Sequence, residues 1–367
     1  MIRMNDFLAE PRELRQQMLD AVSRVLDSGW YVLGKEVEAF EREWAGLCAV
    51  RHCVGVGNGM DALEISLRAL EIGPHDEVIT TPMTAFATVL AIVRAGATPV
   101  LADIDPDTAM LDPESVRRCL TVRTKAIVLV HLYGQAGPIE SILAIAKNHE
   151  IHLIEDCAQA HGAQYKGQPV GSFGSFGAWS FYPTKNLGAI GDAGALTTSS
   201  SELAAKASAL RHYGQTEPHR HQLLGMNSRL DELQAAMLRV RLQYLAGWTQ
   251  RRREIAKLYH ANMRNPQVRV MPAPAEAERH VHHLFVITCP QRDSLQAHLK
   301  AQGVDSLIHY PIPVHWQEPC RLLAHDPEGL RYTEQHTATC LSLPCHPQMT
   351  DDDVERVISA VNAFTGG

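Results

Sequence analysis

The segment Ser180-Phe181-Tyr182-Pro183-Thr184-Lys185 is the most informative part of this 367-residue chain. Pro183 and the glycines after the lysine predict an ordered loop. Taken alone, Lys185 fits a solvated surface residue, because most lysines lie in water. A lysine that forms an imine must be neutral part of the time, which requires burial or nearby cations. Phe181 and Tyr182 would supply an apolar surrounding of that kind.

An apolar segment that ends in acids precedes this loop. His152-Leu153-Ile154-Glu155-Asp156 predicts a buried strand. Ligands in open α/β sheets bind beyond the carboxyl ends of strands, so Asp156 is placed to meet a cofactor. An anionic partner keeps a pyridine nitrogen protonated, which makes the ring an electron sink. Gln159 would then donate to a ring oxygen, although capping of a helix by Asp156 stays open.

A glycine-rich turn, Gly55-Val56-Gly57-Asn58-Gly59-Met60-Asp61, lies between a predicted strand and a predicted helix. Glycines let the backbone approach a ligand, and free N–H groups at a helix start attract phosphate. A dinucleotide-binding fold needs a third glycine, where this chain has Met60, and an acid after the second strand. The acids Asp76 and Glu77 open that strand instead. The turn therefore favours a single phosphate, with Ser180 as a further donor, although an ordinary strand–helix turn stays open.

Apolar segments alternate with helical patterns between residues 50 and 200, which predicts a mainly parallel sheet covered on both faces. The predicted strands are 53–56, 77–80, 99–102, 126–131 and 152–155, and the helices between them are 61–70, 85–95, 113–120 and 139–148. An apolar stripe predicts one long helix over 230–260. A strand at 283–288 and helices at 293–302 and 351–364 follow. We expect a large α/β domain over 1–249 and a smaller α+β domain over 250–367.

Composition argues against several function classes. The 34 basic and 41 acidic residues give a net charge of −7 without a basic run, so no nucleic-acid partner is expected. Apolar runs stop short of about 18 residues and no signal peptide is apparent, so no membrane partner is expected. The eight cysteines are scattered, which is typical of a reduced cytoplasmic enzyme. No metal site is expected either, because alternation would send His280 and His282 to one face and His283 to the other.

Together the motifs resemble the sugar aminotransferase family called DegT/DnrJ/StrS, over residues 29–361. The matching segments are Gly-Asn-Gly-Met-Asp-Ala-Leu (57–63), Thr-Pro-Met-Thr-Ala-Phe-Ala-Thr (81–88), Glu-Asp-Cys-Ala-Gln-Ala-His-Gly-Ala (155–163), Ser-Phe-Tyr-Pro-Thr-Lys-Asn-Leu-Gly-Ala (180–189), and the segments 227–235, 309–315 and 343–347. The resemblance implies the fold-type-I architecture of pyridoxal 5′-phosphate (PLP) enzymes, like that of aspartate aminotransferase. Lys185 stands where some relatives carry histidine and act as dehydratases, so that branch is disfavoured.

The resemblance also implies a role for each matched residue. Lys185 and Asp156 would be catalytic, Lys185 as the PLP-bearing amine and proton carrier and Asp156 as the partner of the ring nitrogen. The cofactor contacts would be Gly59, Met60, Phe86, Asp156, Gln159, Ser180, Lys185 and Asn227. Phe86 would stack on the ring, and Asn227 would reach the PLP phosphate of the partner subunit in a homodimer with shared sites. Relatives often have Thr where this chain has Met60, so phosphate binding would depend more on Ser180, Asn227 and main-chain N–H groups. Substrate contacts would come from Tyr310, His315 and Arg229.

The implied reaction is a PLP-dependent transamination. L-Glutamate would donate its nitrogen and leave the pyridoxamine 5′-phosphate form, which would pass the nitrogen to the keto group of a nucleotide-linked deoxysugar. The segments 81–88 and 130–135 favour a dTDP-linked 3-keto-6-deoxyhexose, and 214–225 is a polar candidate substrate loop. A C4-keto sugar or a keto cyclitol stays open. A non-catalytic regulatory homologue is a further alternative, which the intact Asp156, Gln159, Ser180 and Lys185 argue against.

Overall fold

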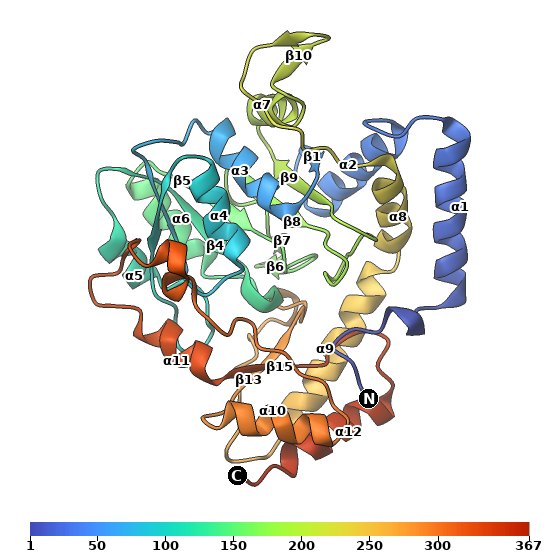
Figure 1. The fold of residues 1–367 in the computed structure, drawn as a ribbon, viewed down its shortest axis with the longest axis vertical. Helices are drawn as coiled ribbons and strands as arrows, with labels where there is room; N and C mark the ends of the chain where they lie inside the picture. Colours follow the sequence, from blue (N-terminus) through green and yellow to red (C-terminus); the bar gives the residue numbers. More distant parts are fainter. Residues whose placement is uncertain (367) are drawn as a thin grey trace.

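The computed structural model describes residues 1–366, and an eight-stranded sheet forms its centre (Figure 1). The strand order is β1-β9-β8-β5-β4-β2-β3-β14. The strands are β1 (His52–Val56), β2 (Glu77–Thr80), β3 (Thr98–Leu101), β4 (Thr124–Val130), β5 (His152–Asp156), β8 (Phe176–Ser180), β9 (Gly194–Thr198) and β14 (Ala324–His325). β9 is antiparallel to its neighbours β1 and β8, and the other neighbouring pairs are parallel. The predicted mainly parallel sheet is confirmed.

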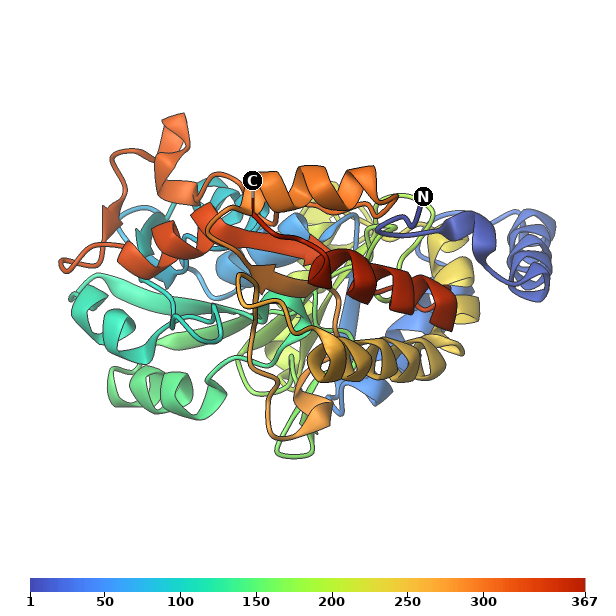
Figure 2. The same ribbon diagram turned by 90° about the horizontal axis from the view of Figure 1, so that it is seen from below.

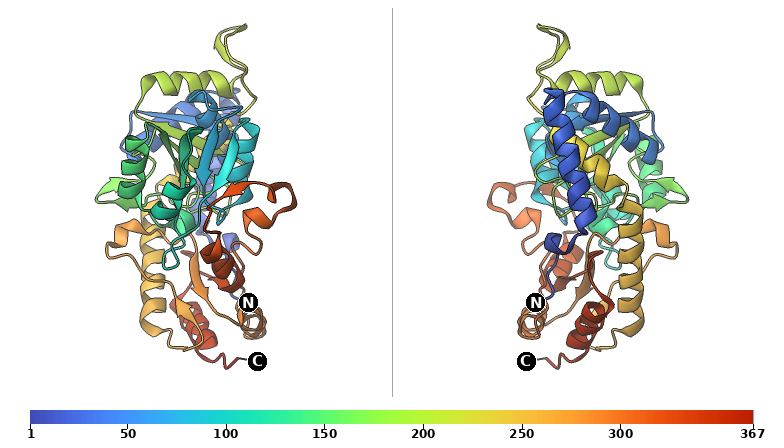
Figure 3. Two further views of the ribbon diagram at one scale, coloured as in Figure 1. Left: turned by 90° about the vertical axis from the view of Figure 1, so that its left-hand side faces the viewer. Right: turned by 90° about the vertical axis from the view of Figure 1, so that its right-hand side faces the viewer.

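Helices cover both faces of this sheet (Figure 3). One face carries α3 (Gly59–Ala69), α4 (Phe86–Arg94) and α7 (Ser201–Arg211), and the other carries α2 (Lys35–Leu47), α5 (Pro113–Cys119) and α6 (Ile139–Asn148). Successive residues of β4 divide between the two cores, with Ala126 and Val128 in one and Ile127 and Leu129 in the other. This division follows from the two-residue period of a strand. It explains why β4 carries apolar residues on both of its faces.

The long helix predicted over 230–260 is in fact two helices. α8 (Glu232–Leu242) ends before α9 (Leu245–Asn262) begins. At the break, Gln243 and Tyr244 donate their N–H groups to carbonyls three residues back, at 3.3 and 3.0 Å, which is a tighter turn than an α-helix makes. α8 packs on α1 (Arg12–Ser28), whereas α9 packs in a separate C-terminal core. The prediction of one helix was wrong because the apolar stripe continues through the break.

The C-terminal part has its own small sheet and core (Figure 2). β12 (Arg269–Val270), β13 (Phe285–Thr288) and β15 (Cys340–Leu343) are antiparallel and pack against α9, α10 (Arg292–Ala301) and α12 (Asp351–Asn362). α11 (Arg331–Thr339) precedes β15. Two segments cross the division predicted at residues 249 and 250, because Ile2 packs in the C-terminal core and β14 extends the large sheet beside β3. The division itself stays a prediction.

Two small hairpins lie outside the main layers. β6 (Gln164–Tyr165) pairs with β7 (Gln168–Pro169), and β10 (Gln215–Glu217) pairs with β11 (Arg220–His221). The β10–β11 hairpin projects from the rest of the molecule at the top of Figure 1. Within residues 1–366, no helix is both long and apolar enough to cross a membrane.

Candidate active site

The candidate site begins where two neighbouring parallel strands end. Asp156 is the last residue of β5 and Ser180 the last of β8, and these strands are hydrogen-bonded neighbours. Lys185 follows in the loop that joins β8 to β9. Main-chain bonds close this loop, with Phe181 N–H donating to Ala193 O at 2.8 Å and Lys185 N–H donating to Tyr182 O at 2.8 Å. The sequence motifs therefore meet at the carboxyl edge of the sheet, where ligands bind in this fold class.

The Asp156 carboxylate is buried and held by one donor on each oxygen. Ala158 N–H donates to Oδ1 at 3.1 Å, and Thr88 Oγ1 donates to Oδ2 at 2.8 Å. Burial raises the pKa of Asp156, and the Thr88 and Ala158 hydrogen bonds and the Lys185 charge oppose the rise. A carboxylate in this setting is suited to pair with a cationic ring nitrogen.

The Lys185 amine has the shifted pKa that imine chemistry needs. Burial lowers its pKa to about 8, although the charge of Asp156 favours the ammonium form. Phe181 is fully buried in the core against Trp44 and His161, whereas Tyr182 is 52 % exposed. Of the two aromatic residues expected to desolvate Lys185, only Phe181 is therefore buried.

Gln159 is oriented by main-chain geometry. Tyr133 N–H donates to Gln159 Oε1 at 2.6 Å, which identifies that atom as the oxygen because a backbone N–H only donates. Gln159 Nε2 lies 3.1 Å from Tyr310 Oη. The amide nitrogen carries a second hydrogen that is left for a ring oxygen. The same contact brings Tyr310, from the C-terminal part, into the site.

The start of α3 forms a candidate phosphate cradle against the end of β8. A Cβ atom on Gly59 would lie 2.6 Å from Ser180 Cβ, so this helix start touches the strand end. Asn58 caps the helix by accepting from Asp61 N–H at 2.9 Å. The N–H groups of Gly59 and Met60, in the first turn, have no partner within the helix and can bind an anion. A single phosphate beside the Ser180 hydroxyl fits this arrangement.

Two residues that the sequence analysis missed shape these contacts. Ser228 Oγ accepts from Gly57 N–H at 3.0 Å and donates to Asp61 at 2.7 Å, and these two bonds hold both ends of the glycine-rich turn 57–61. Thr88, in the first turn of α4, donates to Asp156. The same helix begins at Phe86, which is 38 % exposed. Thr88 lies in a motif that we recognised, but its partner is 68 residues away and no local pattern reveals it.

Three predicted site residues make their contacts away from Lys185 and Asp156. Asn227 is exposed and forms an isolated bridge with His212, and the Arg229 guanidinium lies 5.4 Å from the Tyr213 ring centre. His315 Nε2 lies 3.2 Å from Glu334 Oε1. Among residues 1–366, no hydrogen bond or ion pair joins these three side chains to Lys185 or Asp156. Their roles stay predictions.

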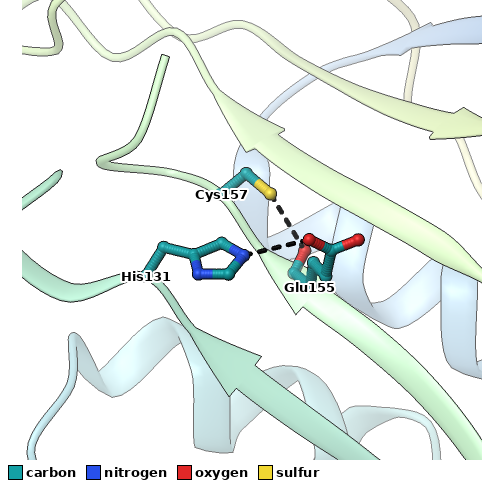
Figure 4. A group of neighbouring side chains, drawn as sticks. All are labelled: His131, Glu155 and Cys157. Carbon is teal, nitrogen blue, oxygen red and sulfur yellow. Dashed lines mark hydrogen bonds and ion pairs between the residues drawn. The ribbon is translucent and has the colours of Figure 1, made fainter. Parts of the chain in front are cut away.

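One group of three side chains of metal-binding type lies close together in the described residues, namely His131, Glu155 and Cys157 (Figure 4). The Glu155 carboxylate already accepts from the N–H groups of Gly171, Phe173 and Gly174 and lies 3.1 Å from His131 Nε2. His131 Nδ1 accepts from Gly137 N–H, so the ring proton is on Nε2 and points to Glu155. Burial raises the pKa of the Cys157 thiol. The group is a structural network that anchors the strand carrying Asp156.

The histidine segment His280–His283 also makes internal contacts. The rings of His280 and His282 stack with centres 3.9 Å apart, whereas His283 Nδ1 meets Asn186 Oδ1 at 3.2 Å. The expected separation of these rings is therefore observed. It arises in a bend before β13, which begins at Phe285, because His282 has a positive φ of 44°.

The residues present fit a PLP molecule. The site offers an amine of lowered pKa, a buried carboxylate for the ring nitrogen, an amide N–H for a ring oxygen and helix N–H groups for the phosphate. Each donor or acceptor matches one polar group of that cofactor. A nicotinamide dinucleotide carries no aldehyde with which the Lys185 amine could form an imine.

Comparisons with known proteins show the family of this chain. The model of the DegT/DnrJ/EryC1/StrS aminotransferase family matches residues 12–362. A dTDP-3-amino-3,6-dideoxy-alpha-D-galactopyranose transaminase of Aneurinibacillus thermoaerophilus is 47% identical over 350 residues, covering 95% of this chain and 96% of the relative. A dTDP-3-amino-3,4,6-trideoxy-alpha-D-glucose transaminase of Streptomyces venezuelae is 44% identical over 360 residues, covering 98% and 95%. The crystal structure of S. venezuelae DesV in complex with a ketimine intermediate superposes with a TM-score of 0.94 at 43% identity, covering 98% of this chain and 97% of DesV. The expected type I fold and cofactor are confirmed, and the chain belongs to the DegT/DnrJ/EryC1/StrS family of PLP-dependent aminotransferases.

Proposed function

We propose that this enzyme transfers an amino group from L-glutamate to the C3 keto group of a dTDP-linked 6-deoxyhexose. The observation that carries the transamination is the Lys185 amine, with its pKa lowered to about 8, beside the buried Asp156 carboxylate. The choice of sugar is supported by the two relatives described above, which are both transaminases of dTDP-linked 3-amino deoxysugars. A cytoplasmic location is proposed too, since all eight cysteines are free and buried.

Each residue has a defined task in this proposal. The bound cofactor supplies an electron sink, and Asp156 holds its ring nitrogen protonated. With the cofactor bound, the Lys185 amine would act as general base toward the donor Cα proton and as general acid at C4′. A pKa near the working pH suits a group that must both accept and release a proton. Gln159 orients the ring through its free N–H.

The proposal includes a homodimer in which Asn227 of the partner subunit completes the phosphate site. Asn227 is exposed, and its segment leads from the projecting β10–β11 hairpin (Figure 3). This hairpin carries the exposed side chains of His219, Arg220 and His221, which suit a substrate diphosphate. We propose that the loop 214–225 and Arg229 serve the partner's substrate site, and that Tyr310 contacts the substrate beside Gln159. His315 stays a prediction without a supporting contact.

Half-reactions test the substrate. The enzyme is converted with pyridoxamine 5′-phosphate and mixed with dTDP-3-keto and dTDP-4-keto 6-deoxyhexoses, a UDP-3-keto sugar and a keto cyclitol. Return of the visible cofactor band should be fastest with the dTDP-3-keto sugar, and a faster return with any other member would refute that choice. A matching panel of amino acids tests L-glutamate. Lys185→Ala should abolish turnover, and near-normal activity of that variant would refute the catalytic assignment.

Mixed dimers test the shared site. Lys185→Ala and Asn227→Ala subunits are each expected to be inactive or strongly impaired. In a mixed dimer, one site would combine the intact Lys185 of one chain with the intact Asn227 of the other. Statistical mixing should therefore restore about a quarter of the wild-type activity, because half of the dimers are mixed and each has one good site. No recovery would show that Asn227 does not act across the subunits.

A further inference from the structure

Two hydroxyl groups form a chain that ends on the Asp156 carboxylate. Thr88 Oγ1 lies 2.8 Å from Asp156 Oδ2, and Thr84 Oγ1 lies 2.8 Å from Thr88 Oγ1. The exposed fractions of Thr84, Thr88 and Asp156 are 4%, 1% and 5%, so little water competes for these bonds. The chain of contacts therefore connects a segment between β2 and α4 with the end of β5.

The ionisation of Asp156 determines the direction of both hydroxyls. An ionised carboxylate only accepts, so the one O–H of Thr88 points at Asp156. The Thr88 oxygen is then free to accept, and Thr84 donates to it. A proton on Asp156 Oδ2 would let the chain point the other way. Hydrogen bonds to charged acceptors are about twice as strong as neutral ones, so the arrangement favours the ionised carboxylate.

The same contact fixes the orientation of the carboxylate. Thr88 occupies Oδ2 and Ala158 N–H occupies Oδ1, so rotation of the carboxylate would break a bond on each side. Thr88 is the third residue of α4, whose first residue is Phe86. One helix start thus supplies both the ring that we expect to stack on the cofactor and the donor that holds its charge partner.

We propose that Thr88 is a positioning residue for the cofactor: its hydroxyl, supported by Thr84, holds Asp156 ionised and oriented toward the pyridine nitrogen. This inference rests on the proposed role of Asp156. It predicts that the loss of the Thr88 hydroxyl changes how the cofactor is bound, although Asp156 stands between this hydroxyl and the pyridine nitrogen.

Thr88→Val removes the hydroxyl with little change of shape, and Thr88→Ser keeps it. Two quantities are measured on purified protein: the dissociation constant of pyridoxamine 5′-phosphate, and the pH midpoint of the visible band of PLP bound to Lys185. Thr88→Val should weaken binding about tenfold and move the midpoint by about one pH unit, because a hydrogen bond to a charged group has roughly that effect. Thr88→Ser should stay within about twofold of wild type. Thr84→Val should show a smaller change in the same direction.

Thr80→Val is the matched control. Thr80 is also fully buried, but its hydroxyl donates to the Val128 carbonyl at 3.1 Å and not to Asp156. It should leave the midpoint and the dissociation constant unchanged. Wild-type values in Thr88→Val, or equal shifts in the Thr80 and Thr88 variants, would overturn the inference. If Thr88→Val does not fold, an unchanged midpoint in Thr84→Val overturns it instead.

Asp156→Asn separates this inference from the proposed function. If Asp156→Asn leaves the band and the affinity unchanged, the role of Asp156 itself is wrong. If Asp156→Asn alters both and Thr88→Val alters neither, only the role of Thr88 is wrong.

Discussion

Replacement of Asp156 by Asn tests how the protein sets the pKa of Lys185. Burial lowers this pKa from 10.5 to about 8, and the negative charge of Asp156 partly opposes the decrease. At pH 7 a pKa of about 8 leaves roughly one amine in ten neutral, whereas 10.5 leaves about one in three thousand. The folded site therefore raises the reactive fraction of this amine about 300-fold at pH 7. Asp156→Asn removes the group that opposes this effect, so the pKa should fall by about one further unit.

The assay is the rate at which cofactor-free protein forms its covalent link to saturating PLP, trapped by borohydride and mapped to Lys185. The wild-type rate should rise with pH to a plateau with a midpoint near 8. The Asp156→Asn midpoint should lie about one unit lower, so this variant should link faster at pH 7 although it turns over poorly. Asp192→Asn, an exposed acid in the same loop, is the control and should match wild type. A midpoint that rises or stays the same in Asp156→Asn would refute the reasoning.

Three further predictions concern the architecture around the site. Gly59→Ala should destabilise the fold by about 1–3 kcal/mol and weaken PLP binding, because its Cβ would lie 2.6 Å from Ser180 Cβ. Gly247→Ala in α9 is the control: its Cβ meets no atom within 4 Å, so urea unfolding should show a neutral or stabilising effect. Asp326→Asn should cost about 3 kcal/mol, because this buried carboxylate binds Arg118 at 2.6 Å and holds the segment of β14; an unchanged unfolding midpoint would count against that anchor. Burial alone would raise the pKa of Asp326, but Arg118 and Ser115 hold it below 3.8, so the stabilisation should be present above that pH and lost as the pH falls through the lowered value. Glu232→Gln should lower stability by about 1–2 kcal/mol, because its carboxylate accepts the N–H groups of Gly34, Glu36 and Val37 at the start of α2; circular dichroism of that variant should show a lower melting temperature than wild type.

The sequence predicted the parts of the site that depend on local pattern. Asp156 ends a strand and Lys185 lies in an ordered loop, as their flanking residues indicate. The contacts that orient these groups join distant segments and leave no local signal. Gln159 meets Tyr310 across 151 residues, and Thr88 meets Asp156 across 68.

The strands β8 and β9 were missed for a different reason. Gly177 interrupts the apolar pattern of β8, and it is required there because a Cβ atom would lie 2.5 Å from Gly171 Cα and 2.6 Å from Thr197 Oγ1. Glycine usually weakens a strand, so the sequence pattern alone argues against one. The close packing of Gly171 and Thr197 against this strand explains why glycine is present. The break between α8 and α9 escaped detection because both helices present one apolar stripe to two different cores.

The opposite pKa shifts of Asp156 and Lys185 have a common cause. Burial raises the pKa of the acid and lowers that of the base, which brings the two values closer and makes both groups easier to neutralise. A working transaminase needs them to respond differently, because the acid must keep its charge while the amine must give up its proton. Thr88 and Ala158 donate to the acid, and both hydrogen bonds oppose the rise of its pKa. No hydrogen bond contributes to the lowered pKa of the amine, which follows from burial against the charge of Asp156. These two hydrogen bonds, one of them from the hydroxyl chain, therefore distinguish two groups that burial alone would drive toward their neutral forms.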